Sequence, residues 1–470
     1  MRRTLRRSCA ACAKSKHSCD LGTPRCSRCT KRRVQCVYAN EPLTAALLPP
    51  SDESGSSGPL VGYNKFPPVD PFESYPSTRL PRAHVQRLIH SFLHKIAFQY
   101  YPLDLNATTN PFLVSWWPLA LGDPALFHVS LQTACLDEEL LAQKGFHNSE
   151  ILMADSVALL RRKVENESLA VQDGTMNSVI TLATIEFGKG NIQVAKMHVD
   201  GVKRLVGLRG GINSVRQTSP LTARMVSWVS MLIMGHPQFE TQDDMGTGNG
   251  IPPTPEWQLS LNAILEAPSE LTLLDIDEEV KEVFIRLRSV FQRAQQTPFT
   301  STRLHDLAGF VIHRLLPSAQ DMANETEPLT ECVRYAIILY MFIMQGPTYF
   351  THVVIFSHIL GRFAGHLQRR EQDTQDPIDV WFLAVGMVAS TGTPHYAWFR
   401  DTARAIAVPL QLGAWDDASI HIKSMLWLET RQGESIFRPH WDAIFDGTEY
   451  PQPSVLAVHR SPNIPSAAFI

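Results

Sequence analysis

Six cysteines lie close together near the start of the 470-residue chain, in the segment CAACAKSKHSCDLGTPRCSRCTKRRVQC. They occupy positions 9, 12, 19, 26, 29 and 36, so the spacing CxxCx6C occurs twice with a six-residue loop between the copies. Two cysteines separated by two residues can bind one tetrahedral metal ion. Two zinc ions need four ligands each, and six thiolates supply them only if two sulfurs bridge both ions. The spacing therefore predicts a binuclear zinc cluster.

Three other roles of these cysteines fit the sequence less well. Disulfides in a secreted chain would follow a signal peptide, but MRRTLRRSCAACA has basic residues with no apolar stretch behind them. A thioredoxin-like redox pair needs a βαβ context, which this Lys/Arg-rich segment lacks. A single-zinc finger uses four ligands and leaves two cysteines without a role. The binuclear cluster uses all six.

Residues 9–36 resemble the fungal binuclear zinc cluster (Zn2Cys6) DNA-binding domain. The resemblance includes Pro24, two residues before the fourth cysteine, and Asp20, directly after the third. It implies two structural Zn2+ ions, each with four cysteine ligands, and two bridging cysteines that belong to both sites. The first site would contain Cys9, Cys12, Cys19 and Cys26, and the second Cys26, Cys29, Cys36 and Cys9.

The resemblance also implies how this domain contacts double-stranded DNA. In the family, the short helix after the second cysteine enters the major groove, and a lysine four residues beyond that cysteine contacts a CGG-type triplet. Lys16 occupies that position here. Ala13 and Ser15 stand where many members have arginine, whereas Lys14 is basic where the family varies. The predicted DNA-binding residues are Lys14, Lys16, Arg25, Arg28, Lys31, Arg32 and Arg33.

The first 38 residues are strongly basic. They contain eleven Lys and Arg residues against Asp20 alone, a formal charge of +10. Two zinc ions and six thiolates reduce this charge to about +8, which is enough to bind phosphates by counterion release. Lys16 suits guanine O6 and N7, whereas the arginines of 31–33 suit the DNA backbone. Residues 2–7 and 31–33 could instead form a solvated basic face or a nuclear import signal. Both DNA binding and this alternative predict a nuclear protein.

The rest of the chain has the opposite charge. The whole chain carries a formal charge of −3, so the residues after position 38 carry −13. A large acidic body behind a small basic head is not expected to bind nucleic acid itself. The other two cysteines, Cys135 and Cys332, lie in apolar helical contexts. We interpret them as buried small hydrophobic residues in a reducing compartment.

Residues 39–77 predict a disordered linker. They contain eight prolines and the run SDESGSSG, a composition that cannot bury a core. No heptad repeat of the kind that sets half-site spacing follows the cluster. A homodimer, if one forms, would therefore be held together by the body.

Residues 78–470 predict an all-α regulatory domain. Apolar residues recur at helical steps over 85–96, 151–164 and 191–208, and Gly210-Gly211 would end the third of these helices. The segments EEVKEVFIRLRSVFQ and ECVRYAIILYMFIM have the same periodicity. The apolar run 335–344 has about half the length that a membrane span requires, so we expect a buried core helix and no membrane contact. The predicted fold class is a small binuclear zinc-cluster domain (residues 1–38) and a large all-α domain, joined by the disordered linker.

The body also resembles a second domain, the fungal-specific transcription factor domain of the second type. The resemblance extends over about a hundred residues and fades beyond about residue 240. It implies a regulatory helical region that acts as an effector or forms dimers, without family catalytic residues. The residues that carry it are NPF at 110–112, PLALGDPALFH at 118–128, Glu186, GN at 190–191, His198, Gly201 and LRGG at 208–211.

The sequence argues against an enzyme. It contains no nucleophile elbow, no phosphate-binding glycine loop and no paired metal ligands on one helix face. LRGG follows a helix, whereas a dinucleotide-binding loop would follow a strand. His84, His90 and His94 share a helix without acids at ligand spacing. The tryptophans 116, 117, 381, 398, 415, 427 and 441 suit packing better than a ligand pocket, since each ring buries a large area.

Together these features predict a nuclear, sequence-specific transcription factor of RNA polymerase II genes that recognises CGG-like triplets. The alternative is a ligand-sensing regulator whose helical body binds a metabolite while the zinc cluster tethers it to DNA. The AKSK segment and the compact build resemble regulators beside fungal secondary-metabolite gene clusters. Activation and repression both stay open: the acidic run DEE at 137–139 could recruit a coregulator or be a solvated helix face.

Overall fold

The computed structural model describes residues 9–19, 26–34, 36, 75–100, 106–143, 145–260, 275–317, 327–346, 352–370 and 376–448. The chain divides into two compact units, Met1–Phe66 and Pro67–Ile470. All but the last three residues of the predicted linker lie outside the described residues, as does Arg25. The first unit contains two short helices, α1 (Ala10–Lys14) and α2 (Ser27–Arg32).

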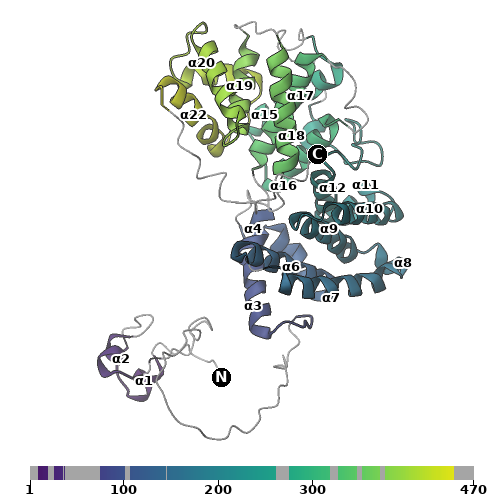
Figure 1. Ribbon diagram of the computed structural model, residues 1–470, viewed down its shortest axis with the longest axis vertical. Coiled ribbons are helices and arrows are strands. Elements are labelled where there is room, and N and C mark those ends of the chain that lie inside the picture. The colour runs from purple at the N-terminus through teal and green to yellow at the C-terminus, as the bar shows by residue number, and fades with distance from the viewer. Residues whose placement is uncertain are drawn as a thin grey trace. The chain divides into compact units, whose positions relative to one another are not determined.

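The second unit is helical, and Figure 1 shows its elements coloured from blue to yellow along the chain. The part up to residue 235 contains α3 (Arg82–Ser91), the π-helical turn η2 (Phe92–Ile96), α4 (Ala97–Tyr100), a second π-helical turn η3 (Phe112–Trp116), α5 (Trp117–Gly122), α6 (Pro124–Ala142), α7 (His147–Val164), α8 (Glu167–Ala170), α9 (Asp173–Gly188), α10 (Ile192–Leu208), α11 (Ile212–Thr218) and α12 (Pro220–Met234). The later part contains α13 (Pro255–Gln258), α15 (Glu278–Ala294), α16 (Ser301–Leu315), α17 (Pro328–Gln345), α18 (Val353–Arg369), α19 (Pro377–Ala389), α20 (His395–Ala407), α21 (Trp415–Met425) and α22 (Arg431–Phe445).

The all-α prediction is confirmed. Within the described residues, the only pairing of extended backbone is an isolated bridge between Thr241 and Ile251. The helix predicted over 191–208 is α10, and the glycine pair after it forms a C-terminal cap. Gly210 has φ of 97°, and the N–H groups of Gly210 and Gly211 donate to the carbonyls of Gly207 and Val206. This pattern closes the last turn of the helix and needs a residue that tolerates positive φ.

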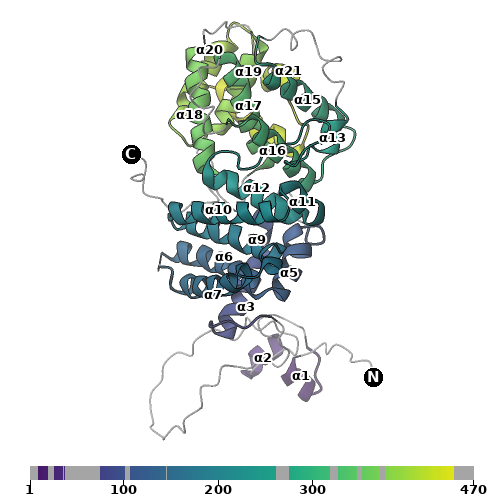
Figure 2. The same cartoon turned by 90° about the vertical axis from the view of Figure 1, so that its right-hand side faces the viewer.

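Two sets of helices pack within this unit. In the first, α9 lies against α6, α10 and α12, and α6 lies against α7, as the stacked helices of Figure 2 show. In the second, α17 contacts α15, α16, α18 and α19, and α19 contacts α20, α21 and α22. Every residue from Tyr335 to Phe342 in α17 is buried. The apolar run is therefore the core helix that the sequence predicts, and no helix in the described part of the chain is long and apolar enough to span a membrane.

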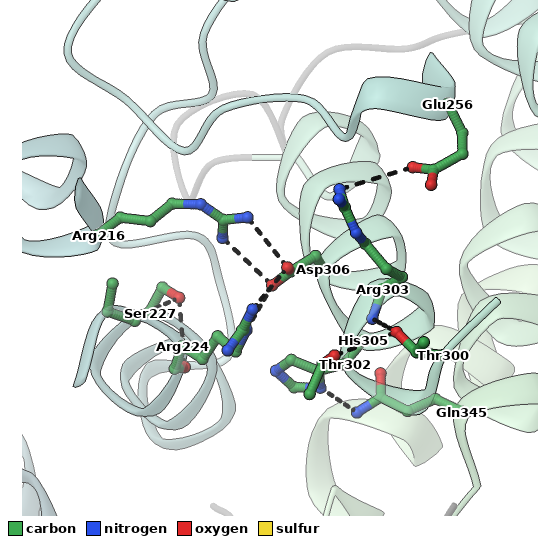
Figure 3. A network of polar contacts seen from close by, with 11 residues as sticks. Arg216, Arg224, Ser227, Glu256, Thr300, Thr302, Arg303, His305, Asp306 and Gln345 are labelled. Carbon is green, nitrogen blue, oxygen red and sulfur yellow. Dashed lines mark hydrogen bonds and ion pairs between the residues drawn. The ribbon is translucent and has the colours of Figure 1, made fainter. Parts of the chain in front are cut away.

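A buried ionic cluster joins the two sets of helices. The Asp306 carboxylate of α16 accepts paired hydrogen bonds from Arg216 of α11 (3.2 and 3.0 Å) and from Arg224 of α12 (2.7 and 2.9 Å), as Figure 3 shows. Burial opposes ionisation of Asp306, but the guanidinium groups of Arg224 and Arg216 outweigh burial and lower its pKa to about 2. The neighbouring His305 ring contacts the Gln345 amide at 2.9 Å. Polar groups thus hold α11, α12, α16 and α17 in register.

Asp244 forms a second ionic cluster in the loop after α12. Its carboxylate accepts hydrogen bonds from the Trp257 indole N–H at 2.8 Å and from Arg314 of α16, and it lies 2.9 Å from the guanidinium of Arg286 on α15. The Asp244 side chain is only 15% exposed. Separating the partners of a buried charge pair would leave each charge uncompensated. Both clusters therefore favour the one arrangement of loop and helices in which these charges are paired.

Candidate metal centre and nucleic-acid interface

The six N-terminal cysteines converge in one cluster. Their sulfurs form two groups of four in which all ligand atoms lie within 4.8 Å of one another. One group contains Cys9, Cys12, Cys19 and Cys26, and the other contains Cys9, Cys26, Cys29 and Cys36. The two groups share Cys9 and Cys26. The geometry therefore gives each group four donors from only six sulfurs.

The distances between sulfurs suit tetrahedral zinc. Cys9 Sγ lies 3.9 Å from Cys26 Sγ and 3.6 Å from Cys29 Sγ, and Cys12 Sγ lies 3.7 Å from Cys26 Sγ. A zinc–sulfur bond of about 2.3 Å gives a tetrahedron with edges of about 3.8 Å. No disulfide joins any of the eight cysteines. The donor set, its number and its spacing all fit zinc.

The two shared cysteines sit at the starts of the two helices. Cys9 precedes α1 and Cys26 precedes α2, and each sulfur accepts a hydrogen bond of 3.4 Å from the backbone N–H three residues later. The hydrogen bond from the Cys12 N–H lowers the pKa of Cys9 to about 6, and the bond from the Cys29 N–H lowers the pKa of Cys26. Backbone donors at a helix start stabilise a thiolate. Backbone hydrogen bonds at the two helix starts thus favour the two shared sulfurs as anions.

Three of the other sulfurs have the opposite tendency. Burial raises the pKa of Cys12 to about 12, and it also raises the pKa values of Cys29 and Cys36. Six thiolates this close together would repel one another without a cation between them. A divalent metal ion supplies the charge that allows all of them to ionise. The cluster is therefore a metal site by its electrostatics as well as by its geometry.

The two halves of the cluster repeat one backbone conformation at an offset of seventeen residues. The His17 N–H donates to the Cys12 carbonyl at 3.0 Å, and the Val34 N–H donates to the Cys29 carbonyl at 3.1 Å. The residue before each of these donors has a left-handed backbone, with φ of 51° at Lys16 and 52° at Arg33. Lys16 and Arg33 thus occupy equivalent positions.

The helix that carries the predicted DNA contacts differs from the expectation in one respect. We expected it to follow the second cysteine, but α1 spans Ala10–Lys14 and includes Cys12. The reason is the Cys9 sulfur, which accepts the N–H of Cys12, the third residue of the helix, and so caps a helix that starts one turn earlier. Lys16 consequently lies beyond the helix, in the left-handed turn that ends it, and its side chain is exposed.

The predicted DNA-binding residues that the structure describes are all exposed. They are Lys14, Lys16, Arg28, Lys31, Arg32 and Arg33. Lys14 of α1 and Arg28 and Arg32 of α2 line one shallow hollow between the two helices, with a volume of about 140 Å³. The other three cations lie outside that hollow. The described residues of this unit include no acid, so the charged side chains described on this surface are all cations.

Comparison with known proteins identifies both domains. Residues 7–45 match the family model of the fungal Zn(2)-Cys(6) binuclear cluster domain, and residues 87–235 match that of the fungal specific transcription factor domain. Both domain resemblances predicted from the sequence are therefore confirmed. The chain is 40% identical over 75 residues to the transcription factor pgmR of Aspergillus terreus (strain NIH 2624 / FGSC A1156). This alignment covers 14% of the chain and 40% of the relative's length. No solved structure matches the chain.

The residues that carry the second resemblance have structural roles. Asn110 donates to the Ala97 carbonyl at 3.2 Å, and Asp123 accepts the first free N–H groups of α6. Glu186 accepts a 2.6 Å hydrogen bond from the Asn191 side chain at the turn between α9 and α10. Arg209 donates to the carbonyl of Val171 and to Asp173. These contacts hold helix ends and turns, which explains motif residues without catalysis.

The other candidate residues of the body contribute to packing. Cys135 and Cys332 are buried as predicted, and burial raises the pKa of each to about 12. The His90 and His94 rings lie 4.3 Å apart, and within the described residues only the cysteine groups bring suitable metal ligands together. Five of the seven tryptophans considered are buried, Trp116, Trp381, Trp415, Trp427 and Trp441, and Trp117 and Trp398 are partly buried against the same core.

Proposed function

We propose that this protein is a nuclear, sequence-specific DNA-binding regulator of RNA polymerase II genes. The observation that carries the proposal is the pair of four-sulfur groups that share Cys9 and Cys26, with only cations among the charged side chains described around them. The two domain matches and the transcription factor relative support it. Transcription factor families of this type are generally not enzymes, and we propose no catalytic activity for this chain.

Two zinc ions would be held by the six cysteines. Each ion would have four thiolate ligands, which leaves no open position for water, so the metal would be structural. It would supply the charge that keeps the buried sulfurs ionised and would fix α1 and α2 relative to each other. We expect each ion to require Cys9 and Cys26, because both four-sulfur groups contain them.

The cations would have two roles in DNA recognition, base contacts and phosphate contacts. We place Lys16 at the guanine edges of a CGG-like triplet, because the turn after α1 exposes it at the end of the helix. Lys14, Arg28 and Arg32 border one hollow and would bind phosphates there, which anchors the domain without reading sequence. Lys31, Arg33 and Arg25 would add further phosphate contacts.

The experiment is DNA affinity sequencing of the full-length, zinc-loaded protein on fungal genomic DNA at near-physiological salt, because low salt favours nonspecific phosphate binding. Peaks centred on CGG-like triplets would support the proposal, and the spacing of paired triplets would report a homodimer. Peaks beside biosynthetic gene clusters would support a role in secondary metabolism, which we propose from the AKSK segment. A folded, zinc-loaded protein that enriched no sequence would contradict it.

A further inference from the structure

A cavity of about 330 Å³ lies in the helical body, remote in sequence from the cysteine cluster. One wall comes from the end of α12 and the residues after it, including Met234 and His236. A second comes from Leu316 and Pro317 after α16, and the third from α17 and α18. This volume lies at the lower end of the range of ligand pockets, so it suits a small molecule.

Two polar groups of this cavity, the Arg362 guanidinium and the Tyr335 hydroxyl, lie side by side. The Arg362 guanidinium of α18 donates to the buried Tyr335 hydroxyl of α17 at 3.5 Å. Burial raises the pKa of that hydroxyl, so it stays protonated and has its own hydrogen to donate. Within the described residues, no carboxylate forms an ion pair with Arg362. Most half-buried arginines of the body have such a partner, such as Arg216 and Arg224 with Asp306.

The surroundings add little further charge. Glu331 is the acid nearest to Tyr335 on α17, and it pairs with Arg334 at 3.1 Å. Partial burial and the neighbouring Arg362 both lower the pKa of His358, so this lining histidine is neutral at pH 7. The cavity therefore presents one fixed positive charge, one hydroxyl and two imidazole rings among apolar side chains.

We propose that this cavity binds a small organic monocarboxylate whose apolar part lies between Met234, Leu316 and Ile359. A guanidinium matches a carboxylate with two parallel hydrogen bonds, and the Tyr335 hydroxyl can donate a third. One positive charge balances one carboxylate. A phosphate monoester carries nearly twice that charge, which a single guanidinium does not balance.

The position of the cavity gives such a ligand a structural consequence. Met234 and Gly235 are the last residues of the matched transcription factor domain, whereas Tyr335 and Arg362 belong to helices beyond it. Gly235 ends α12 with φ of 79°, so the turn that forms this wall depends on a glycine. A bound carboxylate would contact both parts of the body and stabilise their packing. This inference does not depend on DNA binding.

The test uses the full-length, zinc-loaded protein and three probes, 2-naphthoate, 4-phenylbutyrate and decanoate, each compared with its neutral primary amide. Binding is measured by calorimetry and by the shift in melting temperature. We expect at least one acid to bind saturably and at least about tenfold more tightly than its amide, the preference that one charge-assisted pair provides. Phenyl phosphate serves as the competing anion.

Arg362→Met removes the charge and retains an apolar side chain of similar length. We expect it to abolish the preference for acid over amide while the unliganded protein keeps its melting temperature within a few degrees. Arg369→Met, an exposed arginine on the same helix, is the matched control and should bind the acid like the wild type. The proposal is overturned if no acid binds, if acid and amide bind equally, if phenyl phosphate binds more tightly, or if the Arg362 variant keeps the preference.

Discussion

The zinc-cluster domain and the helical body differ in what fills their interiors. The buried residues of the cluster are five of its cysteines, with Ala11 and Cys19 packed against them. The body buries a continuous core of large apolar side chains, in which Trp116, Trp257, Trp381 and Trp441 are almost fully enclosed. The first unit is too small to fold by burial alone, so metal ligands replace the core. The second is large enough to need no such ion.

Removal of zinc should have the largest effect, and it should affect only the first unit. Structural zinc contributes about 10 kcal/mol or more to small domains of this type, so a chelator should unfold residues 9–36 completely and abolish DNA binding. The body should keep its melting temperature, because its described residues bring no set of metal ligands together. Calorimetry of the full chain with and without 1,10-phenanthroline measures both units at once. A shift of the main transition on chelation would show that the two units are not independent.

Substitution of a shared cysteine and of a cysteine that belongs to one group tests how the cluster holds its two ions. Cys26→Ser should remove both zinc ions and leave the domain unfolded, because both four-sulfur groups contain Cys26. Cys19→Ser alters only one group and should retain close to one ion. Native mass spectrometry counts the ions directly. Equal zinc content in the two variants would contradict the sharing.

The body should respond to loss of packing and not to loss of metal. Trp381 is fully buried and its ring lies 5.6 Å from that of Phe284. Trp381→Ala should destabilise the body by about 3–5 kcal/mol in urea unfolding, because it leaves a large cavity. Zinc content should stay unchanged. Trp398→Ala, at a partly buried tryptophan, is the control and should cost clearly less.

Acid should weaken the body through its buried histidines. Burial lowers the pKa values of His305 and His313 to about 4. In the unfolded chain they ionise near pH 6.5, so between about pH 6.5 and 4 the unfolded state binds more protons and stability falls as pH falls, by about 1.4 kcal/mol per pH unit for each histidine. Below about pH 4, protonation of Asp306, whose pKa is lowered to about 2, removes further stability.

Urea unfolding at pH 7, 6 and 5 measures this slope. His313→Asn should reduce it by the share of one histidine, because the asparagine cannot take up a proton. A variant with the wild-type slope would assign the dependence to other groups.

The smallest effect should come from the two equivalent turns of the cluster. Lys16→Ala should leave the domain folded and cost about 1–3 kcal/mol for a CGG-like site, with less loss on other sequences. Arg33→Ala, at the repeated position, should weaken all sequences alike and reduce the salt dependence of binding by about one charge. Titrations at several salt concentrations separate the two. Identical effects of both variants on specificity would contradict our assignment of Lys16.

Sequence reasoning succeeded where a feature depends on residues that lie close together in the chain. The helices over 85–96, 151–164 and 191–208 and the Gly210-Gly211 cap depend on neighbours three to six residues away, and all were predicted. The predicted start of the first helix was wrong by one turn, because a cysteine sulfur has the capping role that serine or aspartate usually has. The spacing of His358, Arg362 and His366 at four-residue steps was a signal for a polar helix face that sequence reasoning missed.

The sequence by itself determined the cluster, the charge division and the helical class, since each follows from residue spacing or composition along a short stretch of chain. Only the tertiary structure placed Arg216 and Arg224 against Asp306, more than eighty residues away, and assembled Met234, Tyr335 and Arg362 around one cavity. Such contacts depend on how helices pack, and helix packing is the sum of many weak, non-directional contacts that no local pattern encodes.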